Sequence, residues 1–475
     1  MLQIVQRRGR TVPDTHPHPS VIPSAARDLL FDSGASFSSC PLSRKQFRPL
    51  GVYNSAVKTL TLCVLVSALA SAGSLDWPQF GGPHRNFTSD STGLASSWPS
   101  SGPKKLWARP LGEGYSGIAI DNDVLYTMYR RGDDEVAVAL DAPTGKTLWE
   151  YAYKAPGGTM ALENGPGPHT TPLIVGDRVC TVGILAQLTC FNKKTGKLAW
   201  SKDLYKDFPG STHMDRGYSS SPILYKNTMI LTLGGSGHAV IALNPETGAL
   251  VWAKNDFGNS PSSPMLINVQ GRDQLVAFLD DASKDSKDLA HGIVAGIDPN
   301  NGQLLWTHPH KTSWDLNIAM PVWGDDNILV ISSAYGTGAR GLRLTQTGGK
   351  TTVQELWYNN RMRIHHSTMV RVGDYIYGSS GDFGPAPLTA INVKTGEIKW
   401  QNREFPKASF VYADGKFIIV DEDGGVSLAL LSPEGVKVLS KASLLNNNAW
   451  TAPSLAGTKL YVRDRKSIMA LEVGK

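Results

Sequence analysis

The stretch NKKTGKLAW, residues 192–200, decides the fold of this chain of 475 residues. The side chain of Asn192 can bond its own backbone, and Gly196 tolerates a positive φ, so the first half favours a tight turn. Short residues then alternate up to Trp200, four positions beyond the glycine. The stretch therefore predicts a turn followed by a strand that carries an aromatic anchor.

The same pattern recurs along the whole chain. Its copies are DAPTGKTLW at 141–149, NPETGALVW at 244–252, DPNNGQLLW at 298–306, NVKTGEIKW at 392–400 and a weaker SPEGVKVL at 432–439. The anchors that these and related units supply are Trp107, Trp149, Trp200, Trp252, Trp306, Trp357, Trp400 and the substitute Leu439. They lie 39 to 54 residues apart, the length of a four-stranded unit with its turns.

The two ends of the repeat are incomplete. After Leu439 only 36 residues remain, enough for about three strands, while the strand around Trp107 has no unit before it. A ring in which this N-terminal strand completes the last unit solves both problems and leaves only short sheet edges. We therefore predict an all-β protein, an eight-bladed β-propeller of four-stranded antiparallel blades over residues 104–475. The anchors should pack between neighbouring blades.

The basic charge of the chain is confined to its first residues. The formal net charge is +6, but residues 1–74 hold eight Lys or Arg and three Asp or Glu, so the remainder carries only +1. This distribution argues against nucleic acid as a partner.

The first 103 residues divide into three parts. Residues 1–53 are rich in Pro, Ser and Arg, and we expect a disordered leader or a segment upstream of the true translation start. Residues 54–72 have a basic residue, a short apolar run and a small-residue cleavage site, the layout of a signal peptide. Residues 73–103 form an extended lead-in. We expect a periplasmic or secreted monomer with no integral membrane span in the mature chain.

Two cysteines remain after the signal peptide, Cys180 and Cys190. They flank a predicted hairpin and could face each other across two strands. Export permits a disulfide, and two small buried apolar residues are the alternative.

The TGKxLW repeat, with units opened by a proline as in TTPLIVGDRV at 170–179, resembles the pyrroloquinoline quinone-type propeller repeat. The lead-in WPQFGGPHRNFTSDSTGL at 77–94 is similar to that of secreted bacterial propellers of this kind. The resemblance implies the fold. It leaves the function open, because the repeat also builds quinoprotein alcohol dehydrogenases and an outer-membrane assembly factor.

Aligning the units on the residue that opens each innermost strand gathers the preceding positions at one mouth of the channel. The openers are Ile118, Pro172, Pro222, Pro264, Pro321, Met369, Phe410 and Pro453. Two positions earlier all residues are small, namely Ser116, Thr170, Ser220, Ser262, Ala319, Ser367, Ala408 and Thr451. Three positions earlier the ring reads Tyr115, His169, Ser219, Pro261, Ile318, His366, Lys407 and Trp450.

The large polar and aromatic side chains of this mouth differ from blade to blade, as in a pocket. We predict that a small ligand or a protein segment binds among Tyr115, His169, Tyr218, Asn317, His365, His366, Lys407 and Trp450. The alternative is that these residues only cap the channel.

Two functional classes follow. The first is a binding or scaffold propeller without chemistry. The second, implied by the resemblance, is a dehydrogenase that uses pyrroloquinoline quinone and calcium, for which Asp215 and Asp315 are the nearest carboxylates. Such enzymes usually carry two adjacent cysteines, and no two cysteines are adjacent here. A role in outer-membrane protein assembly is a further alternative, although the lipid-attachment cysteine is missing.

Overall fold

The computed structural model describes residues 76–158, 160, 165–281, 291–313, 316–382, 384, 386–446 and 448–475. They belong to one compact unit, Leu69–Lys475. The predicted leader and signal peptide lie outside the described residues. In the described part of the chain, no helix has the length and apolar character needed to cross a membrane.

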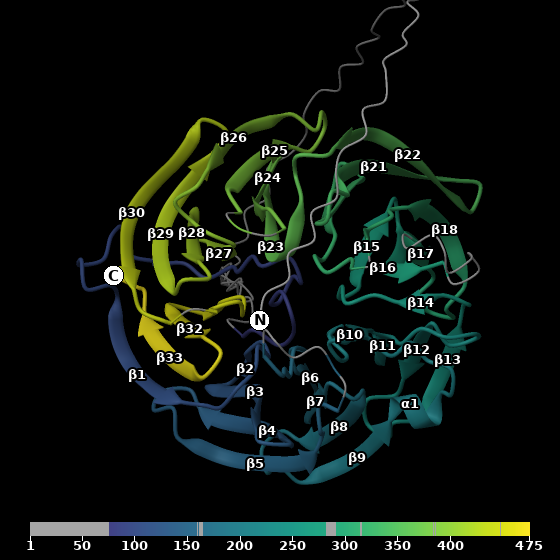
Figure 1. The fold of residues 1–475 in the computed structure, drawn as a ribbon, viewed down its shortest axis with the longest axis horizontal. Coiled ribbons are helices and arrows are strands. Elements are labelled where there is room, and N and C mark those ends of the chain that lie inside the picture. The colour runs from purple at the N-terminus through teal and green to yellow at the C-terminus, as the bar shows by residue number, and fades with distance from the viewer. Residues whose placement is uncertain are drawn as a thin grey trace, which may run out of the picture. The chain divides into compact units, whose positions relative to one another are not determined.

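Eight antiparallel sheets form a ring, which confirms the predicted eight-bladed propeller (Figure 1). Blades 1 and 2 comprise β2 (Ala119–Asp121), β3 (Val124–Arg131), β4 (Asp134–Asp141), β5 (Thr147–Lys154), β6 (Leu173–Val175), β7 (Arg178–Val182), β8 (Gln187–Asn192) and β9 (Leu198–Asp203). The short helix α1 (Leu204–Asp207) follows. Blades 3 and 4 comprise β10 (Ile223–Tyr225), β11 (Thr228–Thr232), β12 (Val240–Leu243), β13 (Leu250–Lys254), β14 (Gly258–Asn259), β15 (Met265–Val269), β16 (Arg272–Asp280), β17 (Gly292–Ile297) and β18 (Leu304–Pro309).

The second half of the ring repeats the plan. Blades 5 and 6 comprise β19 (Val322–Gly324), β20 (Ile328–Ser333), β21 (Gly338–Thr347), β22 (Lys350–Asn359), β23 (Ile364–Val372), β24 (Tyr375–Ser380), β25 (Leu388–Asn392) and β26 (Ile398–Asn402). Blades 7 and 8 comprise β27 (Ser409–Ala413), β28 (Lys416–Val420), β29 (Gly425–Ser432), β30 (Gly435–Ser443), β31 (Ser454–Ala456), β32 (Lys459–Arg463), β33 (Ser467–Glu472) and, from the other end of the chain, β1 (Lys104–Pro110). β1 pairs with β33 and closes the ring, as the orphan strand around Trp107 predicted (Figure 1).

The repeated turn has the predicted chemistry. In its copy at Asn192, the Oδ1 atom accepts the N–H of Thr195 at 3.0 Å, and Gly196 adopts a φ of 69°. The glycine has a second role, because a Cβ atom there would lie 2.6 Å from the indole of Trp149 in the preceding blade. That indole donates its N–H to the Lys193 carbonyl at 3.0 Å.

This indole–turn contact joins successive blades around much of the ring. A Cβ atom on the turn glycine would similarly lie within 3 Å of the preceding indole in four further pairs, which are Gly145 with Trp107, Gly248 with Trp200, Gly302 with Trp252 and Gly396 with Trp357. Trp306 differs, because its N–H goes to Gln274 of its own blade at 2.7 Å. The prediction that the anchors pack between blades is confirmed for Trp107, Trp149, Trp200, Trp252 and Trp357, and Trp400 donates its N–H to the Ser432 carbonyl of the next blade.

The seam between blades 7 and 8 is built differently. In every blade the pairing register of the outermost strand shifts at the residue directly before the anchor. In β30 the shift falls at Leu439. Ser440, and not the predicted Leu439, is therefore the equivalent of the tryptophan. Ser440 bonds both backbone groups of Trp98, at 2.6 and 3.1 Å. Blade 8 also lacks the turn between its last two strands, since they come from opposite chain ends. The lead-in segment supplies the buried Trp98 instead.

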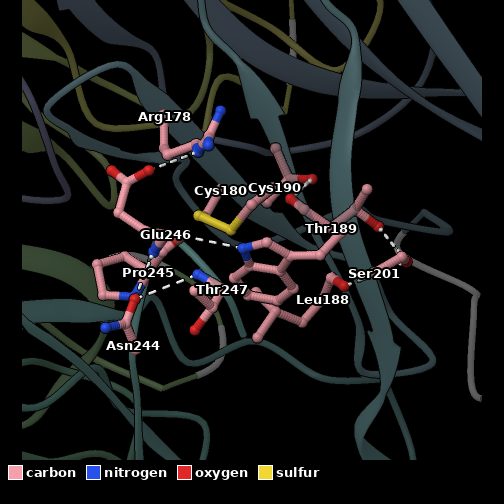
Figure 2. The surroundings of a disulfide bond; sticks show 12 residues. Arg178, Cys180, Leu188, Thr189, Cys190, Ser201, Asn244, Pro245, Glu246 and Thr247 are labelled. Carbon is pink, nitrogen blue, oxygen red and sulfur yellow. Dashed lines mark hydrogen bonds and ion pairs between the residues drawn. A yellow bond between two sulfur atoms is a disulfide. The ribbon is translucent and has the colours of Figure 1, made fainter. Parts of the chain in front are cut away.

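Cys180 and Cys190 form a disulfide between directly opposed residues of β7 and β8, so the predicted facing is confirmed and the bond is present (Figure 2). Figure 2 shows the pair beside the turn of blade 3, where Arg178 forms an ion pair of 2.9 Å with Glu246. Both sulfur-bearing residues are fully buried.

We predict that Gly196→Ala destabilises the protein by about 2 kcal/mol more than Gly415→Ala. Both glycines have a positive φ, so both variants acquire backbone strain, but only at Gly196 does the new methyl group meet an indole. Denaturant unfolding measures the difference. Equal losses of stability would contradict the docking role of the turn glycine.

Replacement of the lead-in tryptophan, Trp98→Ala, should lower the free energy of unfolding by about 3–5 kcal/mol, because a buried indole leaves a cavity at a seam without its own anchor. Leu250→Ala, at a side chain that is 52% exposed, serves as the control and should change stability by no more than about 0.5 kcal/mol. Similar values for the two variants would show that Trp98 does not hold the seam.

Candidate functional site

The predicted mouth lies in the segments that lead into the inner strands. All eight positions located three residues before the openers are partly exposed, and all eight located two before are buried. The alternation shows that one set faces the mouth while the other faces the blades. The sequence alignment of the units therefore placed the ring positions in the correct register.

Aromatic rings from four blades form a continuous arc at this mouth. Tyr115 lies between His169 and Trp450, with ring centroids 6.0 and 5.2 Å apart. Trp450 contacts His366 at 4.7 Å, and His366 contacts His365 at 5.0 Å. The opposite side of the mouth holds the smaller Ser219, Pro261 and Ile318. The mouth is therefore asymmetric.

The arc ends on a residue that the sequence did not reveal. The Tyr335 hydroxyl lies 2.8 Å from Nε2 of His365. Tyr335 belongs to the hairpin connection between β20 and β21, directly before Gly336. Because this hairpin is outside the ring positions, only the folded chain brings Tyr335 to the mouth.

Other polar groups at the mouth fix the arc. The Trp450 indole donates to Glu422 at 3.0 Å, and His169 Nε2 lies 3.2 Å from the Arg216 carbonyl. Below the arc, small hydroxyls join neighbouring blades. Ser116 donates to the Thr170 carbonyl at 2.7 Å, Ser262 to the Ala319 carbonyl at 3.0 Å and Thr451 to the Tyr115 carbonyl at 3.1 Å.

Two of the predicted residues lie in the wall behind the mouth. Tyr218 is fully buried and donates its hydroxyl to the Thr232 carbonyl at 2.8 Å. Asn317 is also buried and accepts a bond of 2.6 Å from Ser333. Their polar groups support the channel wall, so the residues brought together around the opening are the other six.

Ser333 also lies 3.1 Å from His310, but this pair is not a nucleophile with its base. The Ser333 hydroxyl donates to Asn317, so it must accept from His310, the reverse of an activated serine. Both side chains are fully buried.

The histidines of the mouth are neutral at physiological pH. Burial lowers the pKa of His169 to about 4 and that of His365 to about 4. Burial, followed by the charges of His365 and Lys407, lowers the pKa of His366 well below its usual range. Each ring therefore offers one N–H donor and one lone pair.

Of the two carboxylates that a dehydrogenase would use, Asp215 is not part of the arc. Asp215 is exposed on the segment between α1 and β10, and Asp315 lies outside the described residues. None of the eight ring positions holds a carboxylate, and the described residues contain no group of three His, Cys, Asp or Glu that could hold a metal. Calcium requires six to eight oxygen ligands. The eight ring positions supply imidazoles, an ammonium group and a phenol but no carboxylate, a set that does not fit a calcium-bound quinone.

The opposite mouth is closed by the lead-in segment. Its Arg85 is buried and donates to the carbonyls of Ser221, Pro222 and Pro264, at 3.0, 3.0 and 2.7 Å. On either side, Trp77 bridges to β2 and Thr88 bridges to β27. Burial lowers the Arg85 pKa to about 9, so the guanidinium remains charged at neutral pH.

Comparison with known proteins assigns the fold to a family. The model of the family described as outer membrane protein assembly factor BamB, a family with pyrroloquinoline quinone-like repeats, matches residues 132–402, more than half of the chain. The chain belongs to this family. The resemblance inferred from the repeat is thereby confirmed.

The relatives represent both functional classes. Outer membrane protein assembly factor BamB of Moranella endobia is 22% identical over 370 residues, which cover 76% of this chain and 78% of that protein. Quinoprotein alcohol dehydrogenase PedH of Pseudomonas putida is 31% identical over 309 residues, which cover 61% of this chain and 41% of PedH. This chain therefore spans less than half the length of that dehydrogenase. The crystal structure of quinohemoprotein alcohol dehydrogenase from Comamonas testosteroni shares the fold, with a TM-score of 0.60, 12% identity and coverage of 84% of this chain and 81% of that one.

We predict that the free energy of unfolding falls as the pH is lowered from 7 to 4. The pKa values of His169 and His365 are about 4 in the folded protein and near 6.5 when unfolded, so the unfolded chain binds more protons in this interval. Each such histidine contributes up to about 1.4 kcal/mol per pH unit. His169→Gln should reduce the slope of stability against pH, and a slope identical to that of the wild type would contradict the assignment.

Proposed function

We propose that this chain is an extracytoplasmic binding or scaffold propeller that takes a small ligand or a protein segment at the aromatic mouth. The observation that carries the proposal is the arc of stacked rings, from His169 through Tyr115 and Trp450 to His366. These rings are partly exposed and fixed by contacts with one another. Rigid aromatic groups bind with little loss of conformational freedom, because they are already ordered. Neutral imidazoles beside them supply directional hydrogen bonds.

The shape of the channel supports the same function. Arg85 of the lead-in bonds backbone carbonyls at the inner strands, and side chains smaller than those of the arc, Ser219, Pro261 and Ile318, stand opposite it. A ligand would enter and leave on the aromatic side. The disulfide between Cys180 and Cys190 is consistent with an oxidising compartment, such as the periplasm or the exterior.

The identity with PedH keeps a quinone-dependent alcohol or sugar dehydrogenase as a second candidate. The eight ring positions argue against it, because none of them supplies a carboxylate ligand for calcium. The match to an outer membrane protein assembly factor over most of both chains favours a protein partner as a third candidate.

To test the binding function, a fragment mixture should be screened against the full chain by ligand-detected NMR. Fragments that bind the wild type should lose their signal in the variant Tyr115→Ala/Trp450→Ala. Tyr358→Ala provides the control and should retain binding, because this tyrosine lies on β22, the outermost strand of blade 5, and is 48% exposed. Fragments that bind all three proteins equally would show that the mouth is not the binding site.

The dehydrogenase candidate is tested separately by adding pyrroloquinoline quinone and calcium to the purified protein. The binding proposal predicts no dye reduction with alcohols or sugars. Turnover that depends on both additions would replace the binding proposal by the enzymatic one.

A further inference from the structure

The blade 6 side of the mouth contains two imidazole nitrogens without hydrogen-bond partners. His365 and His366 are consecutive residues of β23 at the end of the aromatic arc. Nδ1 of His365 and Nε2 of His366 are shielded from solvent and form no hydrogen bond. A polar atom in such a place costs free energy unless something satisfies it, so this pair calls for a physical explanation.

A hydrogen bond joins the Tyr335 hydroxyl and Nε2 of His365, so Nδ1 is the ring nitrogen left without a partner. When the Tyr335 hydroxyl donates to Nε2 of His365, the single proton of the neutral ring lies on Nδ1, which becomes an unpaired donor. His366 presents Nε2 in the same region, since the two ring centroids are 5.0 Å apart. The neutral state of both rings ensures that each retains one N–H.

A cation lies beside both rings. Lys407 occupies the ring position of blade 7, between those of His366 in blade 6 and Trp450 in blade 8. Burial is the main cause of the low pKa of each imidazole, and the charge of Lys407 is a further cause for both. Lys407 has no ion-pair partner within the described residues. Arg216 adds a second positive charge that acts on His365, His169 and Tyr335.

Each of the two carboxylates near this side has a partner on one oxygen, while Oδ1 of Asp382 has none. Asp382, the carboxylate that acts on His365, lies 3.4 Å from the guanidinium of Arg363. Glu422 accepts the indole N–H of Trp450. The balance of charge therefore favours an anion, which would gain the ammonium charge of Lys407 and hydrogen bonds from the imidazoles.

We propose that His365, His366 and Lys407 form an oxyanion subsite that binds a carboxylate or phosphate group of the ligand, while the rest of the ligand lies against Trp450 and Tyr115. This inference rests on the proposed binding function and specifies the chemistry that the mouth selects. A charged oxygen group would satisfy the two imidazoles and compensate the charge of Lys407. The aromatic arc would bind an apolar portion attached to that group.

Three probes that share a phenyl ring separate the anionic contribution from the apolar one. Benzoate, phenyl phosphate and benzyl alcohol should be titrated into the full chain at pH 7 by calorimetry or by protein-detected NMR. We expect at least one of the two anions to bind tenfold or more tightly than the neutral alcohol. The comparison of benzoate with phenyl phosphate shows which oxyanion the subsite takes.

Variants then locate the preference. Lys407→Met should abolish the tenfold difference, and Lys407→Arg should retain most of it because the charge remains. Lys437→Met removes the same charge from an exposed position of β30 and should leave the preference unchanged. His366→Gln should weaken the anions more than benzyl alcohol. Thermal unfolding of each variant confirms that the fold is intact.

The outcomes distinguish this inference from the proposed function. Binding of all three probes with equal affinity, or an anion preference that survives in Lys407→Met, overturns the oxyanion subsite and leaves the binding function standing. No binding of any probe or fragment at the mouth overturns both.

Discussion

The propeller depends on the contact between the indole of one blade and the glycine turn of the next. Each indole needs a flat surface that no Cβ atom interrupts, and the left-handed turn residue is the position where glycine is favoured anyway. The turn glycine therefore adopts the backbone conformation that its own hairpin requires and also leaves space for the indole of the neighbouring blade. The indole N–H adds direction, as in the bond from Trp149 to Lys193. Because the same contact recurs, neighbouring blades meet in similar ways, as a closed ring requires.

Because the contacts between blades are rigid, the side chains at the mouth can differ from blade to blade. The segments entering the inner strands are fastened by buried hydroxyls such as those of Ser116 and Ser262. Each of these segments can therefore carry a different side chain at the position directly before the hydroxyl residue without loosening the ring. Tyr115, His169 and Trp450 use this freedom to form the arc. Arg463 makes the closing blade equally firm, since its buried guanidinium bonds the carbonyls of Gly114, Ser116 and Met128.

The sequence predicted much of the candidate site because one mouth residue recurs in every blade, at the same place in each repeat. Once the inner strands were aligned, Tyr115, His169, His366, Lys407 and Trp450 followed from counting. One step further back, counting placed His365 at the mouth but failed for two other residues. Tyr218 and Asn317 turn into the wall, where Thr232 and Ser333 bind their polar groups. It failed also for Tyr335, which belongs to a hairpin outside the ring positions.

The sequence by itself determined the number of blades, their order and the closure by the strand around Trp107, because a repeat with its own anchor specifies each blade locally. The tertiary structure alone decided what happens where the repeat is broken. Ser440 stands where blade 7 lacks its tryptophan, and the lead-in brings Trp98 to that seam and Arg85 to the far mouth. These contacts join residues more than 130 positions apart, and no local pattern encodes them, since they arise only when the ring has closed.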